Sequence, residues 1–129
     1  MKVLINCLAI GTAGFFGALT RYGVWILFRR WLPNTSFPIG TFVINVTGSA
    51  FLGWFLTVIG TRAIGPHSET LRLAIATGFL GAYTTFSTYM YESNNLASDG
   101  ALLEALSYLF GSLALGLIGV RLGIYLARL

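Results

Sequence analysis

Residues 78–88 read Gly-Phe-Leu-Gly-Ala-Tyr-Thr-Thr-Phe-Ser-Thr and lie within an apolar run that covers residues 71–91. At about 1.5 Å per helical residue, the run is about long enough to cross a hydrocarbon core about 30 Å thick. Its centre combines two glycines with four hydroxyl side chains, and these residue types are poor helix formers. We therefore predict a helix that is broken near its middle.

A broken helix at membrane depth leaves backbone amide and carbonyl groups without helical partners. Such groups are tolerated only where protein, water or an ion satisfies them, so the break indicates an ion site or a pore. The same residues also fit a packing surface, because Gly, Ser and Thr let membrane helices approach one another closely. The stretch alone leaves both interpretations open.

The composition of the whole chain indicates an integral membrane protein of the all-α class. Of the 129 residues, 56% are hydrophobic and only 9% are charged, which is too few for the surface of a soluble domain. We predict one domain, residues 1–129, with four membrane-spanning helices. Their expected ranges are residues 3–28, 42–60, 71–91 and 101–126. The first range lacks a signal-peptide cleavage site, so we expect it to be retained.

The sequence lacks the residue patterns that nucleic-acid-binding proteins, metal sites, enzymes and cation transporters require. The eight basic residues form no run that could follow a phosphate backbone, so we expect no nucleic acid partner. The single cysteine, Cys7, excludes an internal disulfide, and His67 has no cluster of metal ligands around it. No nucleophile with a base, and no acidic residue near the middle of a span, is visible. An enzyme and a cation transporter are therefore disfavoured.

Arg21 lies inside the first expected span, about two turns before Arg29. An arginine at this depth is costly unless it faces water or reaches the interface, so it is a candidate for a functional role in a vestibule. An interface anchor beside Tyr22 is the alternative. The same span carries small residues at three-residue spacing that favour close helix packing, namely Gly11, Gly14 and Gly17.

The second and fourth expected spans each carry a polar face. Thr41 and Asn45 are one helical turn apart, and Tyr108, Ser112 and Gly116 recur every four residues. These side chains either form hydrogen bonds between or within helices or line a polar path. Together with the broken segment they supply neutral donors, and aromatic ring edges add partial positive charge. Such groups suit a small anion, and the donors are Thr41, Asn45, Thr84, Thr85, Ser87, Tyr108 and Ser112.

These residues closely resemble the CrcB/Fluc fluoride channel family over essentially the whole chain. The most specific part is residues 78–88, and the other matching positions are Arg21-Tyr22, Gly40-Thr41, Asn45 and Gly48. The resemblance implies a passive fluoride channel of the bacterial inner membrane that exports cytoplasmic fluoride and confers fluoride resistance. It also implies a dual-topology homodimer of two antiparallel subunits with two pores.

The resemblance further assigns roles to individual residues. A structural Na⁺ at the centre of the dimer is expected on the backbone carbonyls of Gly81 and Thr84. The pore asparagine falls on Asn45, the first pore phenylalanine on Phe86, and the polar track of the fourth helix on Tyr108 and Ser112. Thr41, Thr85 and Ser87 are expected to line the same path, with Arg21 in the vestibule.

Two positions depart from the family pattern. Tyr89 stands where the family usually has a second pore phenylalanine, so its hydroxyl either alters that site or turns outward. Gly116 stands where some members continue the hydroxyl track, and we leave it out of the expected pore.

Two other functions remain as alternatives. A small dual-topology multidrug or cation exporter has a similar architecture but requires a glutamate in the first helix, which this chain lacks. A structural membrane subunit without transport activity would use the polar groups only for packing. For the channel, the bias of basic residues toward one end of the helices is weak, because Arg21 and Arg121 belong clearly to neither end, and a weak bias predicts insertion in both orientations. Those on the side of the N-terminus are Lys2, Arg62, Arg72 and Arg128, with Arg29 and Arg30 opposite.

Overall fold

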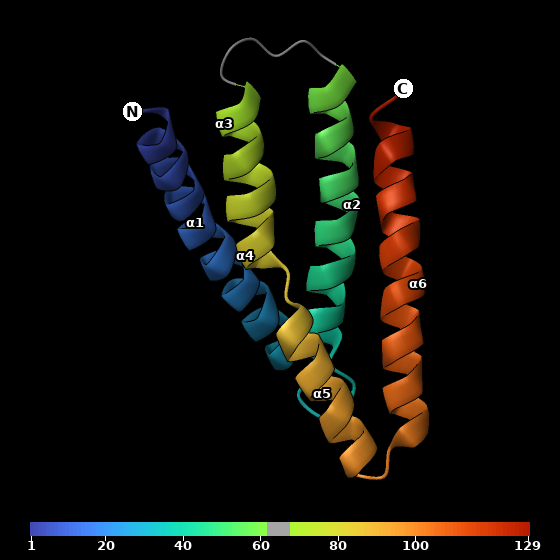
Figure 1. The fold of residues 1–129 in the computed structure, drawn as a ribbon. Helices are drawn as coiled ribbons and strands as arrows, with labels where there is room; N and C mark the ends of the chain where they lie inside the picture. Colours follow the sequence, from blue (N-terminus) through green and yellow to red (C-terminus); the bar gives the residue numbers. More distant parts are fainter. Residues whose placement is uncertain (62–67) are drawn as a thin grey trace.

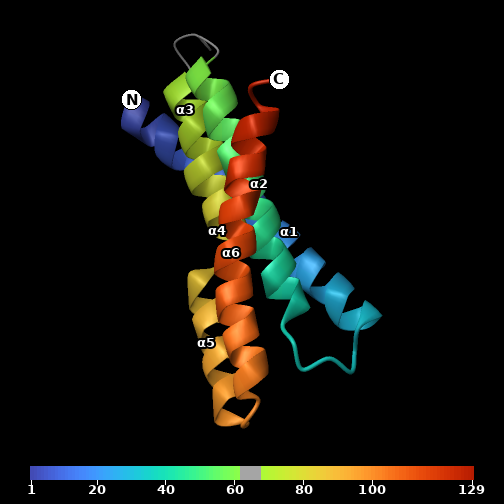
Figure 2. The same ribbon diagram turned by 90° about the vertical axis from the view of Figure 1, so that its right-hand side faces the viewer.

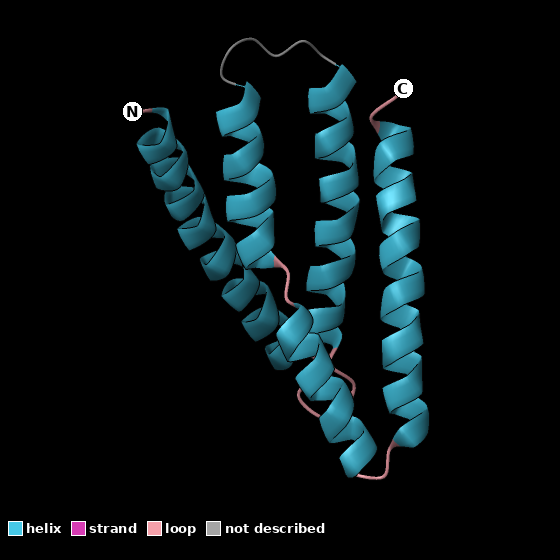
Figure 3. Ribbon diagram, in the orientation of Figure 1, coloured by secondary structure: helices cyan, strands magenta, loops and turns pink. Residues whose placement is uncertain are grey.

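The computed structural model describes residues 1–61 and 68–129, and every regular element in this part of the chain is a helix (Figure 3). Two residues weighed from the sequence, Arg62 and His67, lie outside the described ranges. The elements in chain order are α1 (Lys2–Trp31), α2 (Ile39–Thr61), α3 (Ser68–Arg72), η1 (Leu73–Leu80), α4 (Gly81–Tyr83), α5 (Phe86–Ser98) and α6 (Leu102–Leu126).

Three of these helices, α1, α2 and α6, are long and apolar enough to cross a membrane. They match three of the four expected spans, with ends that differ by no more than three residues. The remaining expected span is divided among α3, η1, α4 and α5, of which η1 is a π-helix. The prediction of an interrupted third segment is therefore confirmed.

Helices α2 and α6 stand side by side, and both termini lie at the same end of the molecule (Figure 1). Helices α2 and α6 run in the same direction, whereas α1 and the divided third segment run in the opposite direction. The view turned by 90° shows that α1 leans away from the α5–α6 pair (Figure 2). The divided segment is thus placed between α1 and the other long helices.

Glycines permit two close helix crossings. Gly17 of α1 lies against the backbone of Phe79, and Gly14 lies against Gly78, so that added side chains at these positions would meet η1. Gly11 has no neighbouring atoms within 4 Å, so the predicted stripe is confirmed at two of its three positions. A second crossing joins α2 to α6, where a Cβ added at Gly123 would lie only 2.8 Å from the backbone nitrogen of Trp54.

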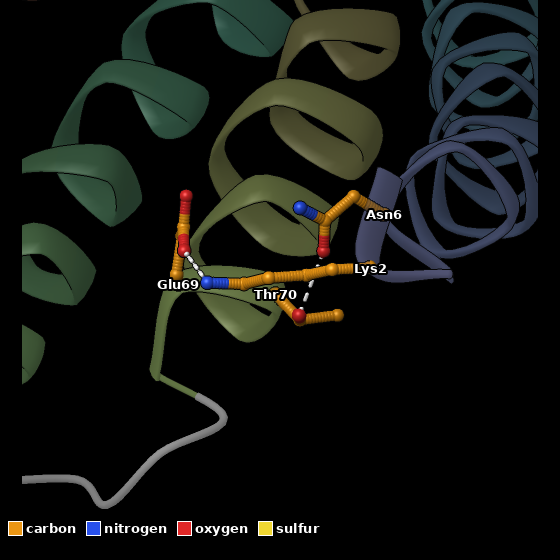
Figure 4. A network of polar contacts seen from close by, with 4 residues as sticks. All are labelled: Lys2, Asn6, Glu69 and Thr70. Carbon is orange, nitrogen blue, oxygen red and sulfur yellow. Dashed lines mark hydrogen bonds and ion pairs between the residues drawn. The ribbon is translucent and has the colours of Figure 1, made fainter. Parts of the chain in front are cut away.

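Two polar contacts join the start of α1 to α3 (Figure 4). Lys2 Nζ lies 2.6 Å from Glu69 Oε2, and Thr70 Oγ1 donates to Asn6 Oδ1 at 2.7 Å. The nearby Lys2 ammonium lowers the pKa of the Glu69 carboxyl below its ordinary value. A lowered pKa means that any stabilisation by this pair is present at neutral pH and is lost as the carboxyl becomes protonated in acid. Both side chains are exposed, so the contribution to stability is small.

Candidate ion pathway

The break in the third segment lies at two threonines. Helix α4 ends at Tyr83, and Thr84 and Thr85 have extended backbone angles with ψ values of 161° and 119°. Helix α5 begins at Phe86, where Thr85 Oγ1 caps it by accepting from the Thr88 amide at 3.3 Å. β-branched residues accept extended conformations readily, so the sequence suits the observed geometry.

The glycines of this stretch do not form the break. Gly78 lies inside η1 and Gly81 is the first residue of α4, so the prediction that both glycines contribute to the interruption is wrong. A Cβ at Gly78 would lie 2.6 Å from the carbonyl oxygen of Ile10. This glycine is therefore required for the close approach of α1 rather than for breaking the helix.

Asn45 satisfies the backbone at the break from the neighbouring helix α2. Its Oδ1 accepts from the Thr85 amide at 2.9 Å, and its Nδ2 donates to the Thr85 carbonyl at 3.0 Å. One side chain thus pairs with both polar backbone groups of an extended residue. Nδ2 carries two N–H donors, so one of them remains for another acceptor.

At the break, two backbone carbonyls lose the amide donors that a continuous helix would supply. In a continuous helix, the amides of Thr85 and Thr88 would donate to the carbonyls of Gly81 and Thr84. Here they donate to Asn45 and to Thr85 Oγ1 instead. Arg21 of α1 is half-buried and reaches the same region, with its Nη1 3.4 Å from the Thr84 carbonyl oxygen. The positively charged guanidinium therefore lies beside the break.

A cavity of about 510 Å³ lies between the break and helices α2 and α6. The cavity is lined by apolar residues, by Gly48, Ser49 and Gly116, and by seven of the predicted site residues: Asn45, Gly81, Thr84, Thr85, Phe86, Tyr89 and Ser112. Ser112 Oγ is shielded from solvent and has no hydrogen-bond partner within the described part of the chain. None of the described residues that line this first cavity is charged.

Thr41 and Tyr108, which are also expected on the ion path, do not line the first cavity. Both are almost completely buried, and their hydroxyl groups donate to the two carboxylate oxygens of Glu92 at 2.9 and 2.8 Å. Glu92 is not among the site residues predicted from the sequence. The available signal is an acidic side chain directly after the apolar run, but its partners lie on α2 and α6 and become apparent only in the fold.

Tyr89 turns its hydroxyl toward α6. Its Oη donates to the Leu109 carbonyl at 2.7 Å, and its ring is packed edge to face against Tyr108 at a centroid distance of 5.1 Å. The ring is also 6.0 Å from that of Phe86, which itself is 72% exposed. The extra hydroxyl is therefore bound to the backbone of the neighbouring helix and does not turn outward.

A second cavity of about 410 Å³ lies beyond Glu92, between α5, the end of α1 and the α1–α2 connection. It is more polar than the first, and Glu92, Arg29, Asn95 and Asp99 are among its lining residues. The Arg29 guanidinium lies 5.0 Å from the centroid of the Trp25 ring. Ser87 lines neither of these two cavities; it is exposed, with Oγ 3.4 Å from Thr85 Oγ1.

Comparison with known proteins identifies the family. The family model described as CrcB-like protein, Camphor Resistance (CrcB), matches residues 8–124. A relative from Chloroflexus aurantiacus is 45% identical over 125 residues, covering 95% of each chain. Relatives from Acidobacterium capsulatum and Hydrogenobaculum sp. are 48% and 44% identical and cover 88% and 97% of this chain, and 89% and 99% of their own. All three are named fluoride-specific ion channel FluC, and the chain described here belongs to this CrcB family.

Proposed function

We propose that this multi-pass membrane protein is a passive fluoride channel rather than an enzyme, and that it lets cytoplasmic fluoride leave down its electrochemical gradient. The observation that carries the proposal is the uncharged first cavity, which joins the Asn45 amide, the Phe86 ring and the free Ser112 hydroxyl. The fluoride channels among the relatives cover almost the whole chain, which supports the same function.

The chemistry of this cavity suits a small, strongly hydrated anion. Asn45 retains one N–H donor after bonding to Thr85, and Ser112 retains its hydroxyl donor. The edges of Phe86 and Tyr89 add partial positive charge. Neutral donors replace part of the hydration shell without the strong binding that a buried lysine would impose, so an anion can also leave.

Passage from this cavity toward the second one involves Glu92. The hydroxyl groups of Thr41 and Tyr108 each have one hydrogen, and both hydrogens are donated to Glu92. A permeating anion gains these donors only when the carboxylate releases them. We therefore assign Glu92 a place on the path, between Tyr108 and the polar second cavity.

Fluoride efflux from liposomes that contain the purified protein tests the channel, with chloride as the comparison ion. We expect fluoride to leave rapidly and chloride to be retained. The Phe86→Ile variant should reduce fluoride efflux by at least about tenfold, because it removes the polarised ring edge at the cavity wall.

Phe15→Ile is a matched control, because Phe15 is 60% exposed on α1 and lies outside this cavity. Normal efflux by a correctly folded Phe86→Ile variant would assign Phe86 to packing. Equal efflux of chloride and fluoride by the unaltered protein would exclude a selective fluoride channel.

We further propose that the channel has four membrane spans and works as an antiparallel homodimer with a Na⁺ ion at its centre. The two carbonyls whose helical donors are diverted, Gly81 and Thr84, support the ion, since two subunits together supply four oxygens suited to a hard cation. The weak bias of the basic residues supports dual insertion: Lys2, Arg72 and Arg128 are assigned to one end, and Arg29 and Arg30 lie in the last turn of α1 at the other.

Removal of Na⁺ tests this assembly. Replacing Na⁺ by a bulky organic cation during refolding should lower both the thermal stability of the dimer and the fluoride flux, because the ion binds only the assembled state. Because Na⁺ is already absent during refolding, an ion that dissociates slowly cannot remain bound. Unchanged dimer stability would contradict the proposed Na⁺ site.

Labelling of single-cysteine variants in native membranes tests the dual orientation. Each connection between helices should be labelled from both sides of the membrane, and labelling from one side alone would contradict the antiparallel dimer.

A further inference from the structure

The two cavities are separated by a pair of tyrosine rings. Tyr89 lines the first cavity, and Glu92 lines the second. Tyr108 is fully buried between them, with its ring against Tyr89 and its hydroxyl on Glu92. A path that connects the two cavities along α5 and α6 therefore meets these two rings.

The ring of Tyr89 is held in place at both of its ends. Its backbone belongs to the first turn of α5, while its hydroxyl donates to the Leu109 carbonyl of α6 at 2.7 Å. Tyr89 is only 4% exposed, so the bond is shielded from competing water. A backbone carbonyl has two lone pairs, and Leu109 can accept this bond in addition to the one within its own helix.

We propose that the hydrogen bond from the Tyr89 hydroxyl to Leu109 acts as a latch. It keeps the rings of Tyr89 and Tyr108 in place between the two cavities and so closes the path from one cavity to the other. Tyr89 is then a positioning residue: an anion passes when its ring moves aside, and the hydroxyl bond to Leu109 is broken during that movement. This inference rests on the proposed fluoride path. It makes the control of passage a particular property of this chain, because the hydroxyl is the group that distinguishes Tyr89 from the phenylalanine expected at this position.

The Tyr89→Phe variant tests the latch because it removes only the hydroxyl. The Leu109 carbonyl keeps its helical donor, so the substitution leaves no unsatisfied acceptor. We expect fluoride efflux to rise about fivefold, which corresponds to about 1 kcal/mol, the usual net worth of one hydrogen bond. Hydrogen exchange of the amides in residues 86–91 should also become faster, since α5 loses a tether to α6.

Tyr83→Phe is the matched control. The Tyr83 hydroxyl is 2.9 Å from Thr47 Oγ1 and the residue is 9% exposed, but it lines neither cavity. This variant should leave fluoride efflux unchanged and should leave exchange in residues 86–91 unchanged.

The two measurements separate the latch from the channel function. Unchanged or slower efflux in a folded Tyr89→Phe variant overturns the latch, as does a rise of the same size in Tyr83→Phe. Unchanged hydrogen exchange in residues 86–91 overturns the tether to α6, whatever the efflux. If the unaltered protein releases no fluoride, the proposed function and the control of passage both fail, while the exchange experiment still decides whether the hydroxyl holds α5.

Discussion

Asn45→Asp is expected to abolish fluoride efflux, with a loss of at least about 100-fold, equivalent to about 2.7 kcal/mol on the barrier. The substitution replaces the Nδ2 donor by a second acceptor. The carboxylate would then face the Thr85 carbonyl at the distance of the present 3.0 Å hydrogen bond, and two oxygen atoms would repel each other. It would also place negative charge in a cavity that is proposed to hold an anion. Both effects act against permeation.

Efflux of fluoride from proteoliposomes measures this effect, and Asn6→Asp is the matched control. Asn6 accepts from Thr70 through Oδ1, a bond that an aspartate also makes, and it lies near Lys2 at the start of α1 (Figure 4). That variant should conduct normally. Asn45→Ser, which carries no charge, separates repulsion from loss of the backbone bonds. Efflux close to normal in a folded Asn45→Asp variant would show that this side chain does not contact the anion.

The polar faces of the helices were predictable from sequence spacing. Thr41 and Asn45 are four residues apart on α2, and both contact the third segment, through Glu92 and Thr85 respectively. Tyr108 and Ser112 likewise share a face of α6, since one packs on Tyr89 and the other lines the cavity that Tyr89 borders. Helical periodicity determines which residues share a face, and this information is present in the sequence.

The partners of these residues were not predictable in the same way. Thr41 and Tyr108 each offer one hydroxyl donor, and the sequence does not tell whether that donor meets an anion or the carboxylate of Glu92. The answer depends on the relative heights of α2, α5 and α6, which packing between helices determines. The position of the break was also only approximate, because Gly78 serves a close contact with Ile10 and stays helical.

The crossing of α2 and α6 determines whether Asn45 and Ser112 face the same cavity, and Gly123→Ala is expected to disrupt it. A Cβ at Gly123 would overlap the Ala50 carbonyl oxygen and would lie 2.8 Å from the Trp54 nitrogen. Both neighbours are backbone atoms, which cannot rotate away, so the two helices must separate. Overpacking of this kind typically costs about 1–3 kcal/mol, and rigid backbone neighbours favour the upper end. Separation of α2 and α6 also moves Asn45 and Ser112 apart across the cavity. We therefore expect fluoride efflux to fall together with stability.

Thermal unfolding in detergent, followed by circular dichroism, measures this loss, with Gly111→Ala in the same helix as the control. Nothing lies within 4 Å of a Cβ added at Gly111, so this alanine meets no neighbour, and it has a higher helix propensity than the glycine it replaces. Gly111→Ala should therefore unfold at the same temperature as the unaltered protein or at a higher one. Similar unfolding temperatures for both variants would mean that α2 and α6 are not in close contact at Gly123. The contact at Gly123 sets the spacing of α2 and α6 along their crossing, and this spacing places Asn45 and Ser112 on the same cavity. Without that contact, the two helices would have to be arranged differently for both residues to face it.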